Sequence, residues 1–107
     1  MTVSTHVLDA ASGRPAPGVG ADLTISVGGS WASVESGATG DDGRLRFTAE
    51  TVTGVYRVIF GTGAYFAARG THTFYPEVVV TFAVASGEHY HVPLLLSPFA
   101  YSTYRGS

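Results

Sequence analysis

The chain contains no cysteine, no lysine and no long apolar run. Without cysteine, neither a disulfide framework nor a thiolate metal site can form. All six basic residues are arginines scattered along the chain, and the formal net charge is -2, so the electrostatic footprint of nucleic-acid binding is missing. No segment is apolar over the length of a bilayer span, and the first residues lack the features of a secretory signal. We therefore expect a cytoplasmic protein that binds neither nucleic acid nor membrane.

What the chain does have is many short segments of alternating character. Fourteen glycines and five prolines divide its 107 residues, a length that suits a single domain over residues 1–107. Apolar and polar residues alternate with the period of two that is typical of half-buried strands. In residues 19–27, for example, the odd-numbered positions form an apolar face. This pattern predicts an all-β sandwich.

About eight strands are predicted in all. Besides residues 19–27, they cover residues 3–8, 31–35, 44–47, 55–60, 78–84, 89–96 and 101–105. The only plausible helix, of about two turns, lies between Gly63 and Gly70. Pro93 stands within a predicted strand, and because proline cannot donate a ladder hydrogen bond, we expect a bulge or an unpaired edge position there.

Because cysteine and lysine are absent, acid–base chemistry depends on histidines, carboxylates and hydroxyl groups. The four histidines are His6, His72, His89 and His91. In strand geometry His89 and His91 share one face, and His6 lies on an N-terminal strand opposite Val3 and Val7. A single strand histidine is most often a surface or hydrogen-bonded structural residue, so the spacing alone does not establish a site.

Two chemistries remain open for these histidines. His89 and His91 could hold zinc together with His6, and the open position could activate water. Alternatively, neutral imidazoles could act as general base and acid on an attacking water, with an arginine stabilising the oxyanion. Arg44 follows a glycine turn and is placed for this role, although spacing alone favours a solvated pair with Asp41 or Asp42.

The aromatic residues 99–104 near the end of the chain also allow two interpretations. A strand there could pack its rings into a core or an interface, or it could close a ligand channel.

Several stretches of the chain are similar to one known family when taken together. They are Ser-Thr-His-Val-Leu-Asp at 4–9, Gly-Arg-Pro-Ala at 13–16, Thr-Gly-Asp-Asp-Gly-Arg at 39–44, Phe-Tyr-Pro-Glu at 74–77, His-Tyr-His-Val-Pro-Leu-Leu-Leu-Ser-Pro at 89–98, and Tyr-Ser-Thr-Tyr-Arg-Gly-Ser at 101–107. This combination resembles the 5-hydroxyisourate hydrolases, the enzymatic relatives of the hormone carrier transthyretin. The resemblance covers essentially the whole chain.

The resemblance implies a prealbumin-like, or transthyretin-like, β-sandwich of two four-stranded sheets with one short helix. It also implies a homotetramer built from two dimers, with the active sites in the channel where the dimers meet. The implied reaction is the ring-opening hydrolysis of 5-hydroxyisourate to 2-oxo-4-hydroxy-4-carboxy-5-ureidoimidazoline in urate degradation. No metal or organic cofactor is expected.

The resemblance also implies particular site residues, carried over position by position. The implied catalytic group is His6, Arg44, His91 and Ser107. The implied substrate-binding group is His6, Arg44, Tyr104 and Arg105. His89 corresponds to a flanking histidine of the motif and not to a catalytic one.

Two rival functions use the same fold. A transthyretin-type carrier would bind an aromatic ligand in the same channel without chemistry, but such carriers lack the histidine of the penultimate strand and the Arg-Gly-Ser ending. A structural β-sandwich module is the other rival, and such modules usually lie inside longer extracellular chains.

Overall fold

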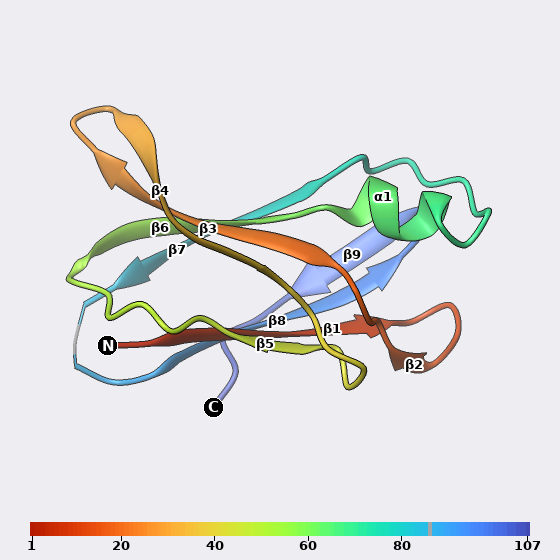
Figure 1. Ribbon diagram of the computed structural model, residues 1–107, viewed down its shortest axis with the longest axis horizontal. Coiled ribbons are helices and arrows are strands. Elements are labelled where there is room, and N and C mark those ends of the chain that lie inside the picture. The colour runs from red at the N-terminus through yellow and green to blue at the C-terminus, as the bar shows by residue number, and fades with distance from the viewer. Residues whose placement is uncertain (86) are drawn as a thin grey trace.

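The structure is a computed structural model that describes residues 1–85 and 87–107 and shows two stacked β-sheets (Figure 1). The first sheet contains β1 (Val3–Asp9), β2 (Arg14–Pro15), β5 (Arg44–Arg46), β8 (Tyr90–Ser97) and β9 (Ala100–Thr103). The second contains β4 (Ser30–Ala38), β3 (Gly20–Val27), β6 (Gly54–Phe60) and β7 (Val78–Val84), in that order. The helix α1 (Thr62–Ala67) follows β6. The predicted all-β sandwich is confirmed, with five strands in one sheet because β2 and β5 both pair with β1.

At the centre of the first sheet, β1 and β8 run parallel, whereas the other strand pairs are antiparallel. On its other edge, β1 pairs with β5 along its N-terminal half and with β2 at its C-terminal end. Residue His6 therefore has Arg44 beside it on one side and Pro93 on the other. This register places three of the implied site positions, 6, 44 and 91, on neighbouring strands.

The apolar faces of both sheets meet in one core. Along β1, Val3 and Val7 point into this core while Ser4 and His6 lie on the opposite, partly exposed face, as the alternation predicted. The largest fully buried side chains are Tyr56, Phe47, Phe60, Phe66, Leu23, Leu94 and Leu96. Because both sheets contribute to this core, the outward face of the first sheet is left free to carry polar groups.

Some sequence expectations differ from the structure at the ends of elements. Val27 was expected on the buried face, but it is 58% exposed because the β3–β4 hairpin extends beyond the sandwich (Figure 1). A register irregularity between Leu23 and Thr24 accompanies this change of direction. The single short helix is confirmed, but its six residues begin one position before Gly63 and end before Gly70. No helix among residues 1–85 and 87–107 is long and apolar enough to cross a membrane.

Pro93 lies inside β8, which is a central strand and not an edge. The pairing of β1 with β8 continues through Pro93 without a bulge. On the other side, the Pro93 carbonyl accepts a hydrogen bond from Thr103 Oγ1 at 2.7 Å, and the ladder of β9 ends at Thr103. The missing N–H therefore faces a position where no ladder partner is required. The unpaired position is confirmed, but the expectation of a bulge or an edge is wrong.

A buried carboxylate ties the helix to the first sheet. Asp9 accepts hydrogen bonds from Tyr65 Oη at 2.8 Å and from the backbone N–H groups of Ala11 and Ser12 at 3.0 and 3.1 Å. Burial, followed by the bond to Asp9, raises the pKa of Tyr65 above its ordinary value. The hydroxyl therefore stays protonated and holds α1 against the end of β1.

The turn before β5 depends on Gly43. Its φ of +75° is rarely adopted by other residues, and its carbonyl accepts the Val7 N–H at 2.8 Å. A Cβ at this position would lie 2.4 Å from the Val7 carbonyl oxygen. The close approach brings the start of β5, and hence Arg44, alongside β1.

We expect Gly43→Ala to destabilise the fold by about 3 kcal/mol or more, because the cost of backbone strain and the cost of a steric clash with Val7 are added together. Gly13 is the matched control, since its φ of +73° is similar but a Cβ there would meet nothing within 4 Å. Gly13→Ala should cost only about 1 kcal/mol. Urea unfolding monitored by circular dichroism measures both free energies, and equal losses would contradict the argument.

Candidate functional site

The candidate site lies on the outward face of the first sheet. His6 comes from β1, Arg44 from β5 and His91 from β8, and the strand register sets His6 beside Arg44 and Ser4 beside His91. A shallow cavity of about 200 Å³ opens on this face. It is lined by Ser4, Thr5, Arg44, Leu45, Arg46 and His91. The sheet thus brings together two histidines and an arginine that are far apart in the sequence.

One ring nitrogen of His6 is already engaged by the backbone. Its Nε2 lies 3.0 Å from the carbonyl oxygen of Asp42. Because a carbonyl oxygen can only accept, this bond assigns a proton to Nε2. In the neutral ring, Nδ1 is then the nitrogen with a free lone pair, which is what a hydrogen bond from water requires.

His91 is held by a hydroxyl group. Its Nδ1 lies 2.7 Å from Ser4 Oγ, so that Nε2 is the nitrogen left for a reactant. Burial lowers the pKa of His91, and the positive charges of Arg44, His6 and His89 lower it further, against a smaller opposing effect of a hydrogen bond with Ser4. The ring is therefore uncharged at neutral pH, which is the form that can accept a proton.

Arg44 is exposed and only loosely paired. Its Nε lies 3.9 Å from Asp42 Oδ2, and both side chains are mostly exposed to solvent. Such a pair contributes less than about 1 kcal/mol, so it does not withdraw the guanidinium from other partners. Asp42 instead makes a firmer contact with the backbone, because its Oδ1 accepts the Arg44 N–H at 3.0 Å. The expected pair with Asp42 exists, and it leaves Arg44 able to contact an anionic or polarised oxygen.

The C-terminal tail returns to His91. Strand β9 ends at Thr103, earlier than the expected strand over residues 101–105, and the Gly106 N–H then donates to the His91 carbonyl at 2.9 Å. A Cβ at position 106 would lie 2.4 Å from His91 Cδ2. Only glycine permits this approach without displacing the ring, and Ser107 follows it directly in the chain.

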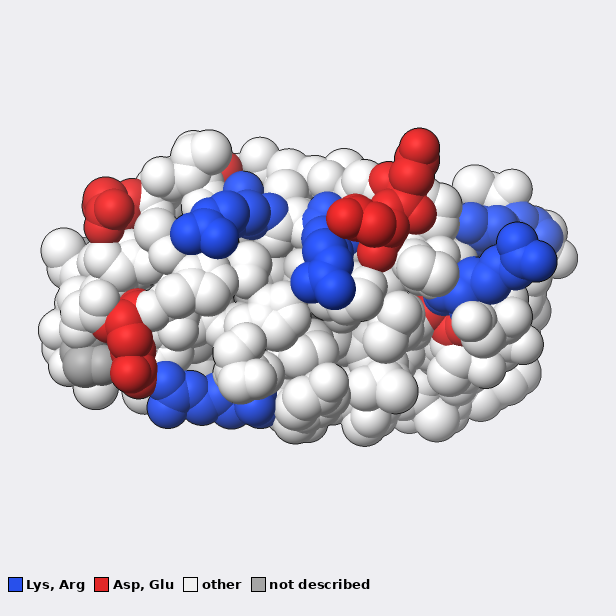
Figure 2. Space-filling model, turned by 90° about the horizontal axis from the view of Figure 1, so that it is seen from below, with Lys and Arg blue, Asp and Glu red and all other residues white. Residues whose placement is uncertain are grey.

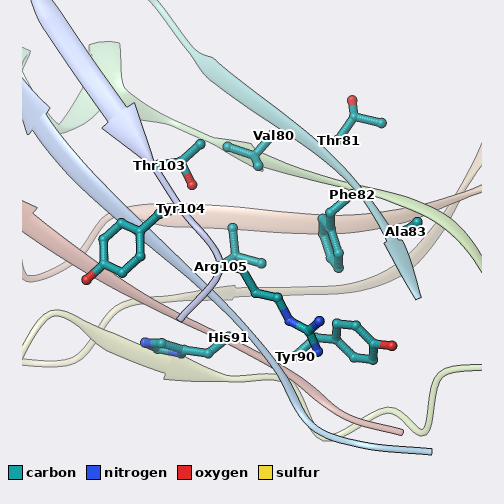
Figure 3. A pocket seen from close by; sticks show the side chains of 10 residues that line it. Val80, Thr81, Phe82, Ala83, Tyr90, His91, Thr103, Tyr104 and Arg105 are labelled. Atoms are coloured by element: carbon teal, nitrogen blue, oxygen red, sulfur yellow. The ribbon is translucent and has the colours of Figure 1, made fainter. Parts of the chain in front are cut away.

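Arg105 and Tyr104 lie on another side of His91 from the shallow cavity. They line a second cavity of about 320 Å³ between the β7 edge and the tail, together with Phe82, Tyr90 and His91 (Figure 3). Arg105 forms an ion pair with Glu88, and its guanidinium carbon stands 4.8 Å from the centre of the Tyr90 ring. Arg105 therefore contacts Glu88 and Tyr90 and does not join Arg44 and His6.

His89 turns toward β1. Its Nε2 lies 2.7 Å from Ser4 Oγ, and its Nδ1 lies 2.6 Å from Thr2 Oγ1. Among residues 1–85 and 87–107, no three histidine, aspartate or glutamate side chains are grouped so that they could hold a metal ion. The geometry therefore gives no support to the zinc alternative. Sequence reasoning missed Ser4, whose only signal was its place two residues before His6 on the same strand face.

The charges on this face are dispersed. Viewed from the side of the first sheet, the basic groups form no continuous stripe on a largely uncharged surface: some adjoin at the right end of the view, the others are separate, and acidic groups lie near several of them (Figure 2). A nucleic-acid backbone would require a continuous basic stripe. A small ligand needs only one or two such charges.

Comparison with known proteins shows the family of the chain. A family model described as the HIUase/Transthyretin family matches residues 3–106. The chain belongs to this family. A 5-hydroxyisourate hydrolase of Salmonella dublin is 46% identical over 109 residues, which cover 98% of this chain and 80% of that protein.

Solved structures of both branches of the HIUase/Transthyretin family resemble the fold. The 5-hydroxyisourate hydrolase of Klebsiella pneumoniae aligns with a TM-score of 0.90 at 35% identity and covers 100% of both chains. Transthyretin from Sparus aurata aligns with a TM-score of 0.92 at 32% identity, over 97% of this chain and 95% of that one. The fold alone therefore does not separate a hydrolase from a carrier, and the side chains of the site must do so.

We expect His91 to titrate below the ordinary histidine pKa of 6.5. Replacing Arg44 by glutamine should raise the pKa of His91 but leave it lowered, because burial is the larger cause. Nitrogen-detected NMR titration of both proteins measures these values. A His91 pKa at or above 6.5 in the wild type would contradict the described environment.

Proposed function

We propose that this protein hydrolyses 5-hydroxyisourate to 2-oxo-4-hydroxy-4-carboxy-5-ureidoimidazoline, a step of urate degradation. The observation that carries the proposal is the contact of Gly106 with His91, which joins the C-terminal motif to the histidine of β8. The curated relatives support it, since those from Salmonella are named 5-hydroxyisourate hydrolase. The proposed setting is the cytoplasm, where a cysteine-free chain needs no oxidising environment.

In the proposed mechanism, the two histidines handle the water. His6 Nδ1 accepts a hydrogen bond from the water and orients it, and His91 Nε2 takes its proton as the oxygen attacks the ring carbonyl. The same nitrogen of His91 then returns this proton to the ring nitrogen that leaves. The water has thereby added its hydroxyl to the carbonyl carbon and its proton to the nitrogen, which opens the ring.

Arg44 and the tail complete the proposed site. Arg44 stabilises the negative charge that develops on the carbonyl oxygen. Ser107, which follows Gly106, offers a hydroxyl group to the site, and Tyr104 and Arg105 contact the substrate from the side of the second cavity. No metal or organic cofactor takes part in this mechanism. Because Arg105 is engaged with Glu88 and Tyr90, its contact with substrate would require it to exchange these partners.

A carrier function is the second candidate, and the similarity to Sparus aurata transthyretin is the observation in its favour. A carrier channel needs shape and apolar surface but has no use for a neutral histidine held at a defined nitrogen. The hydrogen bond between Ser4 and His91 and the close approach of Gly106 therefore favour the hydrolase.

We also propose that the chain assembles as a homotetramer, a dimer of dimers. Strands β7 and β9 are edge strands that flank the same cavity, so that their unpaired backbone groups can pair with a second copy. Phe74, Phe99 and Tyr101 expose 72%, 65% and 42% of their surface. Both the apolar surface and the open, shallow site would be covered by association, which would also exclude water from the reaction.

The direct test adds the protein to 5-hydroxyisourate freshly made by urate oxidase and follows its ultraviolet decay against the spontaneous rate. We expect strong acceleration that prolonged chelation does not change. His91→Asn should lower turnover by about 100-fold or more, because asparagine cannot exchange a proton near neutral pH. His72→Asn, on an exposed loop, should be nearly silent. If micromolar protein does not accelerate the decay, the hydrolase proposal is wrong. If the two variants lower turnover equally, the catalytic role of His91 is wrong.

Removing residues 105–107 tests the tail. The truncation deletes the Gly106 contact with His91 and the hydroxyl group of Ser107, so we expect hydrolysis to fall at least about 10-fold. The tail is exposed, and the truncation removes one backbone bridge to His91 together with the surface contacts of Arg105 with Glu88 and Tyr90, so thermal unfolding and solution mass should change little. An unaltered rate would show that the tail has no part in the reaction.

Light scattering after size exclusion tests the assembly, and the expected mass is four times the 11.1 kDa chain. Tyr101→Lys places a charge on the exposed β9 edge and should dissociate the tetramer. Val52→Lys is the control, since Val52 is 64% exposed in the loop before β6 and belongs to neither edge strand. A monomeric wild type with full activity would contradict the assembly proposal.

A further inference from the structure

A chain of hydrogen bonds leads from His91 to the surface. We propose that Ser4 and His89 are positioning residues that relay a proton between His91 Nδ1 and solvent, so that His91 Nε2 can take up and return a proton without the ring becoming charged. This inference rests on the proposed hydrolase function and adds two residues to it. His89 and Ser4 stand outside the catalytic group that the sequence implied.

The relay consists of three short contacts in sequence. Ser4 Oγ lies 2.7 Å from His91 Nδ1 and 2.7 Å from His89 Nε2. On the far side, His89 Nδ1 lies 2.6 Å from Thr2 Oγ1. His91 is partly buried, whereas His89 is exposed, so the chain runs from the site to water.

The parallel pairing of β1 and β8 creates this arrangement. In that register Ser4 stands directly opposite His91. Residues two apart on a strand share a face, so Thr2 lies on the same side as Ser4, and His89 on the same side as His91. Each of the three contacts therefore crosses between the β1 side and the β8 side, and the relay stays on the outward face.

A single serine hydroxyl allows only two directions in this relay. If Ser4 donates to His89 Nε2, then His91 Nδ1 must donate to Ser4, and His91 Nε2 carries the lone pair of a base. If Ser4 donates to His91 Nδ1, then His89 Nε2 donates to Ser4, and His91 Nε2 carries a proton. Reversing the direction thus changes His91 Nε2 from a proton acceptor to a proton donor.

The relay neither gains nor loses a proton over one catalytic turnover. As His91 Nε2 takes a proton from water, its Nδ1 proton passes to Ser4, the Ser4 proton passes to His89 Nε2, and the His89 Nδ1 proton leaves by way of Thr2. When His91 Nε2 gives its proton to the leaving nitrogen, each of these transfers reverses. The ring of His91 stays neutral in both states.

The surroundings of His91 explain why a neutral ring is useful. Among the groups around His91, four are cationic or can become so, namely His6 on β1, Arg44 and Arg46 on β5, and His89 before β8. On the side of the second cavity, Arg105 adds a further positive charge beside Tyr90 and Tyr104. An additional positive charge on a partly buried ring among them would be unfavourable. A relay moves that charge to the exposed end of the hydrogen-bond chain.

The plainer alternative is that Ser4 and His89 only hold the ring in place. Ser4→Ala removes the relay, whereas Ser4→Thr keeps its hydroxyl, and Ser33→Ala on the exposed strand β4 is the matched control. In the urate-oxidase assay we expect kcat of Ser4→Ala to fall about 10- to 100-fold with KM within about 2-fold, and Ser4→Thr to restore most of it. Ser33→Ala should match the wild type.

Rates in mixtures of H2O and D2O separate a relay from simple positioning. If several protons move together, a plot of the wild-type rate against the fraction of D2O is curved. The same plot should be a straight line for both Ser4→Ala and His89→Asn. The double variant should be no slower than Ser4→Ala alone, because both changes break one chain. His89 is exposed, so His89→Asn keeps the test available if Ser4→Ala does not fold.

The outcomes separate this inference from the function on which it rests. An inactive wild type rejects the hydrolase proposal and the relay with it. An active wild type with a straight-line deuterium dependence, an unimpaired Ser4→Ala, or a loss that appears only in KM would overturn the relay and leave the hydrolase standing. A curved wild-type dependence that both variants abolish, with rescue by threonine, supports it.

Discussion

The parallel pairing of β1 with β8 is the contact on which the candidate site depends. It joins the start of the chain to its penultimate strand, and its register places Ser4 opposite His91 and His6 opposite Pro93. A shift of one residue would turn either strand over and send His91 into the core and Val92 to the surface. The buried residues Val3, Val7 and Leu94 resist such a shift, so the packing of the core fixes the geometry of the polar face.

The tail adds a second constraint, which acts through the backbone. Pro93 cannot donate a ladder bond, and β9 stops at Thr103, so the chain leaves the sheet and returns only at Gly106. That return works because Gly106 has no side chain to meet the His91 ring. The proline and the glycine, which look like interruptions of a strand, thus bring the end of the chain to the site.

The sequence was sufficient to predict the sandwich and the faces of three histidines and of Arg44, because these follow from a period of two. It could not show that Ser4 links His89 to His91, since that link depends on which strands pair and in which direction. Nor could it show that Arg105 turns toward Glu88 and Tyr90. Periodicity gives the face of a residue, whereas contacts between distant strands follow from topology.

The similarity to transthyretin shows that the fold itself does not require a catalytic function. The core and both sheets would serve a carrier equally well, as the TM-score of 0.92 with the Sparus aurata protein indicates. The hydrolase proposal rests instead on the polarity of one sheet face, on which β1 contributes Ser4 and His6 and β8 contributes His91. Because these side chains point away from the core, changing them alters the packing little. A binding channel and a hydrolytic site can therefore differ by a few outward residues and a three-residue tail.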